Sequence, residues 1–312
     1  MRVAGTSFIG SLATQLNSLQ AQQYQLQSQA STGLRVQAPE DDPAAMELTL
    51  NLKAESSRVA QYTQTISTLQ DRANASYSAI AALKTISDRA EEIATQADGT
   101  KSDQDLKTMA SEVAQMIQTA VQLMNTKYGD QYLFGGTASG QAPFVLQFDN
   151  NGIITGVNYT GNTLQAQNEI AEGSTVTVDV VGVNNLATGA RGLISDSRYG
   201  ADFFNHLISL QNHLSSGDTD AINQTDLPAL KKDEDNIIYH IGNNGAVQTR
   251  LEAAAGQADA RTQLLESGIS NTSGADLAQT LTKLSQAQNA YQVALQSSAT
   301  ILQLQGTLLN YL

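Results

Sequence analysis

The sequence has no cysteine and no tryptophan, only four prolines, and few charged residues, 15% of its 312 positions. Without cysteine there is no disulfide, no thiolate nucleophile and no cysteine-ligated metal. The charges are mostly acidic, with 17 lysine and arginine against 30 aspartate and glutamate and a net charge of −13. Such a chain lacks the positive surface that binds nucleic acid or anionic membranes non-specifically. We therefore expect neither as a partner.

Long apolar runs are also missing. No run approaches the roughly 18 apolar residues that a membrane span needs. The first residues lack the continuous apolar core and small-residue cleavage site of a secretory signal. If the protein is exported, we expect it to leave without a cleaved signal peptide.

Proline is absent from 44–142 and from 229–312, and both stretches are rich in alanine, leucine and glutamine. Such stretches favour helices, because proline removes a backbone donor and clashes inside a helix. The pattern predicts a first helix that ends at Gly33, a second over about 59–97, and a third that begins at Asp103 as its N-cap.

The pattern changes after Tyr128 to short β-branched runs between glycine-rich turns. Residues 144–159 predict a hairpin, in which Asn151 and Gly152 supply the two positive φ angles of a tight turn. A further strand is expected over 174–183. We interpret 136–195 as a small β-rich insertion.

Helical periodicity returns at Asp202, with helices over 203–214 and 227–267 and a last helix capped by Asp276. Gly242 and Gly245 leave the boundaries of the second of these open. The predicted fold is mainly α with a small β-rich insertion and long terminal helices that pair as in a coiled coil. The expected domains are 1–58 plus 272–312 as a terminal helical assembly domain, 59–135 plus 196–271 as a helical domain, and 136–195 as a β-rich domain.

The first and last helices carry apolar residues spaced alternately three and four apart, which is the seam of a heptad repeat. The predicted seam consists of Ile9, Leu12, Leu16, Leu19 and Leu26 in the first helix, and Leu277, Leu281, Leu284, Tyr291, Leu295, Leu302, Leu309 and Leu312 in the last.

Charge is nearly absent from both ends. Residues 1–34 and 268–312 hold only Arg2, Asp276 and Lys283 among 79 positions. A helix that faces water normally carries charges on its outer face, whereas an uncharged face enters a protein contact without desolvating an ion. We infer that both ends pack on each other and then on neighbouring copies. The alternative is that both are core helices of one large bundle.

No arrangement of residues predicts catalysis. His206 and His213 have no nearby carboxylate pattern, so we expect no metal site. The acids at 233–235 are interpreted as a solvated helix face, and those at 40–42 as helix-capping residues. The glycines at 135–140 lack the lysine and hydroxyl residue of a phosphate loop. We expect no enzyme activity and no cofactor.

Four segments carry a family resemblance: STGLR at 31–35 with APEDDP at 38–43, YGDQYLFGGT at 128–137 with APF at 142–144, NAYQVAL at 289–295, and LLNYL at 308–312. The chain resembles the flagellin superfamily, most closely its hook-associated protein 3 (FlgL) family. The motif residues are Gly33, Arg35, Asp41, Asp42, Pro43, Tyr132, Leu133, Phe134, Gly135 and Gly136.

This resemblance implies a structural protein of the bacterial flagellum, with inner, middle and outer domains in the order given above. It implies export by the flagellar type III apparatus with a chaperone, and an extracellular ring at the hook–filament junction. The implied partners are further copies of the chain, the first hook-associated protein and flagellin. The alternatives are a filament flagellin, with the same architecture, and a secreted helical-bundle adhesin.

Overall fold

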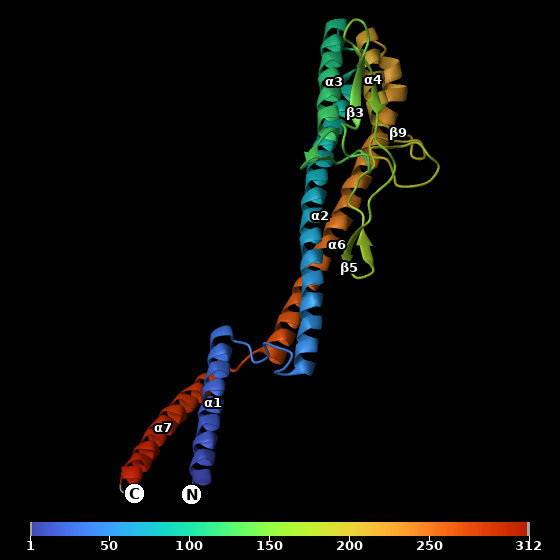
Figure 1. The fold of residues 1–312 in the computed structure, drawn as a ribbon. Coiled ribbons are helices and arrows are strands. Elements are labelled where there is room, and N and C mark those ends of the chain that lie inside the picture. Colours follow the sequence, from blue (N-terminus) through green and yellow to red (C-terminus); the bar gives the residue numbers. More distant parts are fainter. Residues whose placement is uncertain (1, 311–312) are drawn as a thin grey trace. The chain divides into compact units, whose positions relative to one another are not determined.

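The computed structural model describes the backbone of residues 2–310 and the side chains of residues 10–301 and 303. Its helices are α1 (Arg2–Thr32), α2 (Pro43–Gln96), α3 (Asp103–Met124), α4 (Phe203–Ser216), α5 (Thr219–Ala221), α6 (Leu227–Ser273) and α7 (Leu277–Asn310), with a π-helical turn η1 (Ile222–Asp226) before α6 (Figure 1). The chain is mainly helical with a small β insertion, which confirms the predicted fold class.

The strands all lie between α3 and α4. They are β1 (Lys127–Tyr128), β2 (Gln131–Tyr132), β3 (Phe144–Phe148), β4 (Ile154–Tyr159), β5 (Asn168–Ala171), β6 (Ser174–Val176), β7 (Val183–Asn184), β8 (Ser195–Asp196) and β9 (Ala201–Asp202). They form three two-stranded antiparallel sheets, β1–β2, β3–β4 and β5–β6, and one three-stranded sheet, β7–β8–β9. In the last, β7 and β8 are parallel while β9 is antiparallel to β8.

The chain divides into two compact units, residues 1–58 with 261–312, and residues 59–260. In the first unit α1 pairs with α7, and the start of α2 meets the end of α6. Arg261 of α6 forms an ion pair with Glu55 of α2. The two ends of the chain are therefore held in the same unit.

Local capping explains where the helices begin. Asp276 precedes α7, and its Oδ1 accepts a hydrogen bond from the backbone N–H of Gln279 at 3.0 Å, as predicted. The start of α3 differs from the prediction. Its N-cap is Ser102, which forms a reciprocal capping box with Asp105, and Asp103 is already the first helical residue. Ser102 and Asp103 can both act as an N-cap. Ser102 takes this role because Asp105, three residues later, completes the capping box with it.

The core of the second unit lies between α2, α3, α4 and the start of α6. Phe134, Phe203, Ile117 and Leu207 are among its largest fully buried side chains. The β3–β4 hairpin packs beside α3 and α4 through Phe144, whose ring lies 5.0 Å from Tyr159 and 5.5 Å from Phe204 between centroids. Aromatic residues thus pack the β3–β4 hairpin against the helices.

Two details of the β region correct the sequence analysis. In the hairpin turn only Gly152 has a positive φ, +81°, and Asn151 does not. The turn instead depends on Asp149, whose carboxylate accepts hydrogen bonds from the N–H groups of Asn151 and Ile153. The strand expected over 174–183 ends at Val176, where its ladder with β5 ends at Asn168. Beyond it, Asp179 forms an ion pair with Arg72 at 2.8 Å.

Helix α6 runs without a break through Gly242 and Gly245, which settles the boundary that the sequence left open. A Cβ added at either glycine would meet no atom within 4 Å. We expect Gly242→Ala and Gly245→Ala each to raise the free energy of unfolding by about 0.5–1 kcal/mol. The reason is that alanine loses less backbone conformational entropy than glycine when the chain folds into a helix. Urea unfolding measures the change.

Gly217→Ala is the matched control for that experiment. Gly217 follows α4 with a φ of +74°, a left-handed conformation that alanine adopts only with strain. We expect this variant to lose about 1 kcal/mol. If Gly242→Ala lowered stability to the same extent, the helix could not be as free of neighbours there as the structure indicates.

Candidate assembly surface

Helix α7 turns a row of mostly small side chains toward α1. Along α7 the buried and half-buried positions recur three and four residues apart, at Thr280, Leu284, Ala287, Tyr291, Ala294, Ser298 and Ile301. The side chain of Gln23 in α1 donates a hydrogen bond to the backbone carbonyl of Ala287 at 3.0 Å. Small residues allow two helix backbones to approach closely, so this row forms the contact within the chain.

The predicted seam residues of α1 whose side chains are described lie on the less exposed side of that helix. Leu12, Leu16 and Leu19 are half-buried, and Leu26 is 8% exposed. The side chain of Ile9 lies outside the described residues.

The predicted seam residues of α7 divide into two rows. Leu284 and Tyr291 belong to the row that faces α1, whereas Leu281 and Leu295 are 56% and 43% exposed. Leu277, at the start of the helix, is 48% exposed. The side chains of Leu302 and Leu309 and the whole of Leu312 lie outside the described residues. The sequence analysis followed the leucines, but the alanines and threonine beside them mark the side that faces α1.

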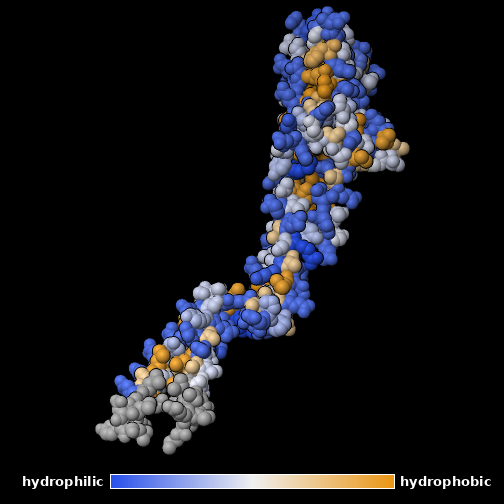
Figure 2. Space-filling view, viewed as in Figure 1, coloured by the Kyte–Doolittle hydropathy of each residue, from blue (hydrophilic) through white to orange (hydrophobic). Residues whose placement is uncertain are grey.

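Leu281 and Leu295 are separated by two heptads, and Leu302 and Leu309 continue the same spacing in the sequence. We call Leu281, Leu295, Leu302 and Leu309 the leucine row. Further large apolar side chains of the first unit are also exposed, at Tyr24, Leu48, Leu50, Leu264 and Val293. Figure 2 shows apolar side chains at the surface over α1 and α7. An uncharged helical pair with exposed leucines has the composition of a surface that is buried in an assembly.

The motif residues at 33–43 hold together two connections of the first unit, the one from α1 to α2 and the one from α6 to α7. Gly33 has a φ of +70°, and its carbonyl accepts a hydrogen bond from the N–H of Ala275 at 2.8 Å. The N–H of Arg35 donates to the carbonyl of Ser273 at 2.7 Å, and its guanidinium donates to that of Thr272 at 2.9 Å. The chain leaving α1 and the chain entering α7 are thus bonded to each other.

The two aspartates of the motif, Asp41 and Asp42, fix the connection between α1 and α2 through hydrogen bonds. The Oδ2 of Asp41 accepts hydrogen bonds from the N–H groups of Gln37 and Ala38, which lower its pKa. Asp42 accepts from the N–H of Ala45 at 3.1 Å and pairs with Arg35 at 3.3 Å, and both bonds lower its pKa. It caps α2, whose first residue, Pro43, has no N–H to satisfy. The structure therefore brings all five motif residues of this segment together.

The second motif segment lies in the other unit and has a packing role. Leu133 and Phe134 are 2% and 0% exposed, and Lys127 lies over the ring of Tyr132 at 4.5 Å. A Cβ at Gly135 would come within 2.8 Å of the Ala138 carbonyl oxygen. Gly136 has a φ of +64°, and a Cβ there would come within 2.4 Å of the backbone oxygen of residue 162. Only glycine fits these two positions.

The histidines are not isolated, which corrects the sequence analysis. The Nδ1 of His206 lies 2.7 Å from Oδ2 of Asp233, and that of His213 lies 2.7 Å from Oδ2 of Asp226. Both aspartates are 1% exposed. The acids at 233–235 are therefore not a solvated face, since Glu234 also pairs with Lys84 at 2.8 Å and only Asp235 is exposed. The partners of these acids come from other helices, which sequence spacing did not reveal.

The pair of His206 and Asp233 makes stability depend on pH. Burial alone would lower the pKa of His206, but the hydrogen bond to Asp233 and the charges of Asp202 and Asp226 outweigh burial and raise it. A raised histidine pKa contributes stability that is fully present below about pH 6.5 and is lost as pH rises through the folded-state value. We expect His206→Gln to remove this alkaline loss, which thermal unfolding at pH 6 and pH 8.5 would detect. An unchanged difference between the two pH values would contradict it.

No group of three or more histidine, aspartate or glutamate side chains within the described residues is placed to hold a metal ion. In the same part of the chain, no helix is long and apolar enough to cross a membrane.

Comparison with known proteins finds similarity to flagellar proteins. Residues 9–139 match the bacterial flagellin N-terminal helical region. The chain is thus similar to flagellins over about two fifths of its length. Over 131 residues it is 29% identical to flagellar hook-associated protein 3 of Escherichia coli strain K12, which covers 41% of this chain and 41% of that protein. The matched region thus spans about two fifths of the curated relative.

Solved structures share the fold of this chain. A protein described as flagellar hook-associated, from Vibrio parahaemolyticus, is 19% identical with a TM-score of 0.62, and the match covers 75% of this chain and 100% of that one. FlgL from Xanthomonas campestris is 18% identical with a TM-score of 0.55, over 70% of this chain and 98% of that one. The flagellin match includes both motif segments. The first lies in the connection between α1 and α2, with Pro43 as the first residue of α2, and the second lies in the connection after α3.

Proposed function

We propose that this chain is a structural subunit of the bacterial flagellum that forms a ring at the hook–filament junction. The observation that carries the proposal is the nearly uncharged α1–α7 pair, which leaves Leu281 and Leu295 exposed in a chain whose residues 9–139 match the flagellin N-terminal region. Exposed apolar side chains on such a surface mark a contact with neighbouring proteins. The names of the relatives, hook-associated protein 3 and FlgL, favour the junction over the filament.

In this proposal each part of the chain has its own role. Residues 1–58 with 272–312 form the inner assembly domain, 59–135 with 196–271 the middle domain, and 136–195 the β-rich outer domain. The leucine row contacts neighbouring copies. The ring joins the first hook-associated protein to flagellin, and an export chaperone holds the chain before it leaves the cell. The role is structural, and no reaction is assigned to it.

A filament flagellin is the second candidate, because it shares the family and the helical architecture. The difference lies in the head-to-tail contact. A surface that accepts its own copy gives an open filament, whereas one that accepts a different subunit stops at one layer. A secreted helical-bundle adhesin is the third candidate, and it requires a stable monomer with a defined ligand.

Immuno-electron microscopy of flagella from the source organism tests the proposal, with an antibody against residues 145–195. We expect label in a single band where hook meets filament. Label along the whole filament would make the chain a flagellin. Label on the cell surface with none on flagella would favour the adhesin.

A further inference from the structure

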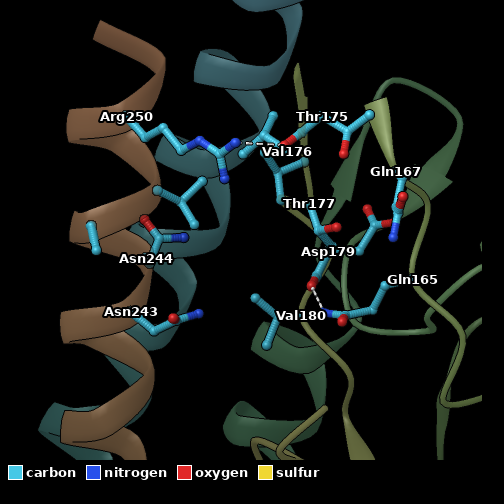
Figure 3. Close-up of a pocket in the computed structure, with 13 residues that line it drawn as sticks. Gln165, Gln167, Thr175, Val176, Thr177, Asp179, Val180, Asn243, Asn244 and Arg250 are labelled. Carbon is cyan, nitrogen blue, oxygen red and sulfur yellow. Dashed lines mark hydrogen bonds between the residues drawn. The ribbon is translucent and has the colours of Figure 1, made fainter. Parts of the chain in front are cut away.

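A cleft of about 500 Å³ lies in the second unit, between α6 and the chain that follows β6 (Figure 3). Asn243, Asn244 and Arg250 line it from α6, and residues 175–180 face them. Its volume is within the range of about 300–1,000 Å³ that is typical of ligand-binding clefts. None of its residues belongs to the unit that carries the leucine row.

One wall of the cleft is a strand-like segment, residues 176–180, in which several backbone groups have no hydrogen-bond partner within the described residues. The β5–β6 ladder ends where Val176 pairs with Asn168. Valine continues to alternate with polar residues over 176–180, which is the period of an extended strand. The backbone groups of Thr177, Val178 and Val180 have no hydrogen-bond partner within the described residues. An unpaired strand edge of this kind is a template for the backbone of another segment.

The charges around the cleft favour an anionic group. The carboxylate of Asp179 is already satisfied by Arg72 at 2.8 Å and by the N–H of Ala166 at 2.9 Å. Arg250 donates to the carbonyl of Thr175 at 2.8 Å but forms no ion pair within the described residues. Its side chain reaches across from α6 toward Thr175 and Val176 in Figure 3. In a chain of net charge −13, Arg250 is thus a cation without a carboxylate beside the open backbone.

We propose that this cleft binds an extended peptide segment of a partner protein by strand addition along residues 176–180, with a carboxylate side chain of that segment beside Arg250. Backbone hydrogen bonds to Val178 and Val180, whose backbone groups point to the same edge of the strand, supply the affinity. Arg250, together with the exposed amide of Asn243, selects an acidic residue, because a guanidinium–carboxylate pair is a charge-assisted hydrogen bond.

Hydrogen exchange of the full chain measures this binding directly. The probes are two capped pentapeptides of alternating threonine and valine, one with a central glutamate and one with a central glutamine. We expect the glutamate peptide to slow amide exchange over 176–180 and to bind about fivefold more tightly than the glutamine peptide, the size of one solvent-accessible ion pair.

Three variants separate the contributions. Arg250→Gln is expected to abolish the preference for glutamate and to keep binding of the glutamine peptide. Asn243→Asp places a negative charge at the same site without touching the Arg250–Thr175 bond, and is expected to weaken the glutamate peptide selectively. Arg58→Gln, which removes an exposed arginine outside the cleft, is the matched control and should change neither affinity.

The proposal is overturned if neither peptide slows exchange over 176–180, or if protection appears elsewhere in the chain. It is also overturned if Arg250→Gln and Arg58→Gln have equal effects on the glutamate preference. These outcomes concern only the second unit, so they leave the assembly role of the terminal helices unaffected.

Discussion

Leu295→Asp is expected to abolish assembly while leaving the monomer folded. Leu295 is 43% exposed in the single chain, so an aspartate there is solvated and should change the free energy of unfolding by no more than about 0.5 kcal/mol. Once a neighbouring copy covers the leucine row, the same carboxylate is buried without a partner. That costs about 3–5 kcal/mol per contact, enough to prevent ring formation.

The measurement has two parts. Thermal unfolding of the purified variant reports the monomer, and complementation of a strain that lacks its own copy reports assembly through motility and the junction band. We expect exported but unassembled protein in the medium. Leu295→Met, which keeps an apolar side chain of similar size, is the matched control and should restore motility. Cooperative loss of the whole fold in Leu295→Asp would show instead that the terminal helices belong to one core.

A second comparison tests which row of α7 faces inward. Ala287 is 6% exposed in the row that faces α1, so Ala287→Asp should separate α1 from α7 and destabilise the monomer, unlike Leu295→Asp. The two variants place the same charge eight residues apart on one helix. If both lowered monomer stability equally, the division of α7 into an inward row and a leucine row would be wrong.

The sequence predicted most helices well because their signals are local, although α2 begins at Pro43 rather than at about residue 59. Heptad spacing located the less exposed side of α1, and Asp276 was identified as a cap from its position alone. On α7 the same reasoning assigned residues of two different rows to one seam. Leucine dominates a hydrophobic pattern, whereas the row that packs against α1 is recognised by small residues such as Ala287 and Ala294. The spacing of apolar residues shows which side of a helix is hydrophobic. It does not show which side carries the small residues that let another helix pack closely.

Contacts between distant segments account for the remaining differences. The strand predicted over 174–183 stops at Val176, and Asp179 beyond it pairs with an arginine 107 residues earlier. Asp233 looked solvated because its partner, His206, lies 27 residues away on another helix. Neither pairing has a local sequence signal. The family motif at 33–43 was recognised, but its purpose, bonding the exit of α1 to the entry of α7, depends on Ser273, far along the chain.

His240 is expected to make the second unit sensitive to acid. The side chain is 5% exposed, and its Nε2 has no hydrogen-bond partner within the described residues. Burial lowers the pKa of His240 to about 4, although a hydrogen bond to the Gly192 backbone opposes the shift; the charge of Arg191 lowers the pKa further, and that of Asp196 raises it. The folded protein therefore keeps this histidine neutral at pH values where the unfolded chain protonates it.

The direction of the effect follows from proton binding. Below about pH 6.5 the unfolded chain binds a proton at His240, whereas the folded chain keeps this histidine neutral down to about pH 4. The free energy of unfolding therefore falls as pH decreases from 6.5 toward 4. The loss between pH 7 and pH 5 is about 2 kcal/mol. Burial and the neighbouring Glu234 carboxylate raise the pKa of Glu91 to about 7, and this group acts in the opposite direction, as does His206. The wild-type curve alone therefore does not isolate His240.

Comparison with His240→Gln isolates it. Glutamine has no charge to lose, so the difference in unfolding free energy between variant and wild type should shift by about 2 kcal/mol in favour of the variant from pH 7 to pH 5. Urea unfolding at both pH values measures the shift. His206→Gln serves as the control and should shift the difference in the opposite direction, because the hydrogen bond to Asp233 and the nearby aspartate charges raise the pKa of His206. A constant difference for His240→Gln would mean that the folded protein admits the proton, and that the side chain is less buried in solution than its 5% exposure indicates.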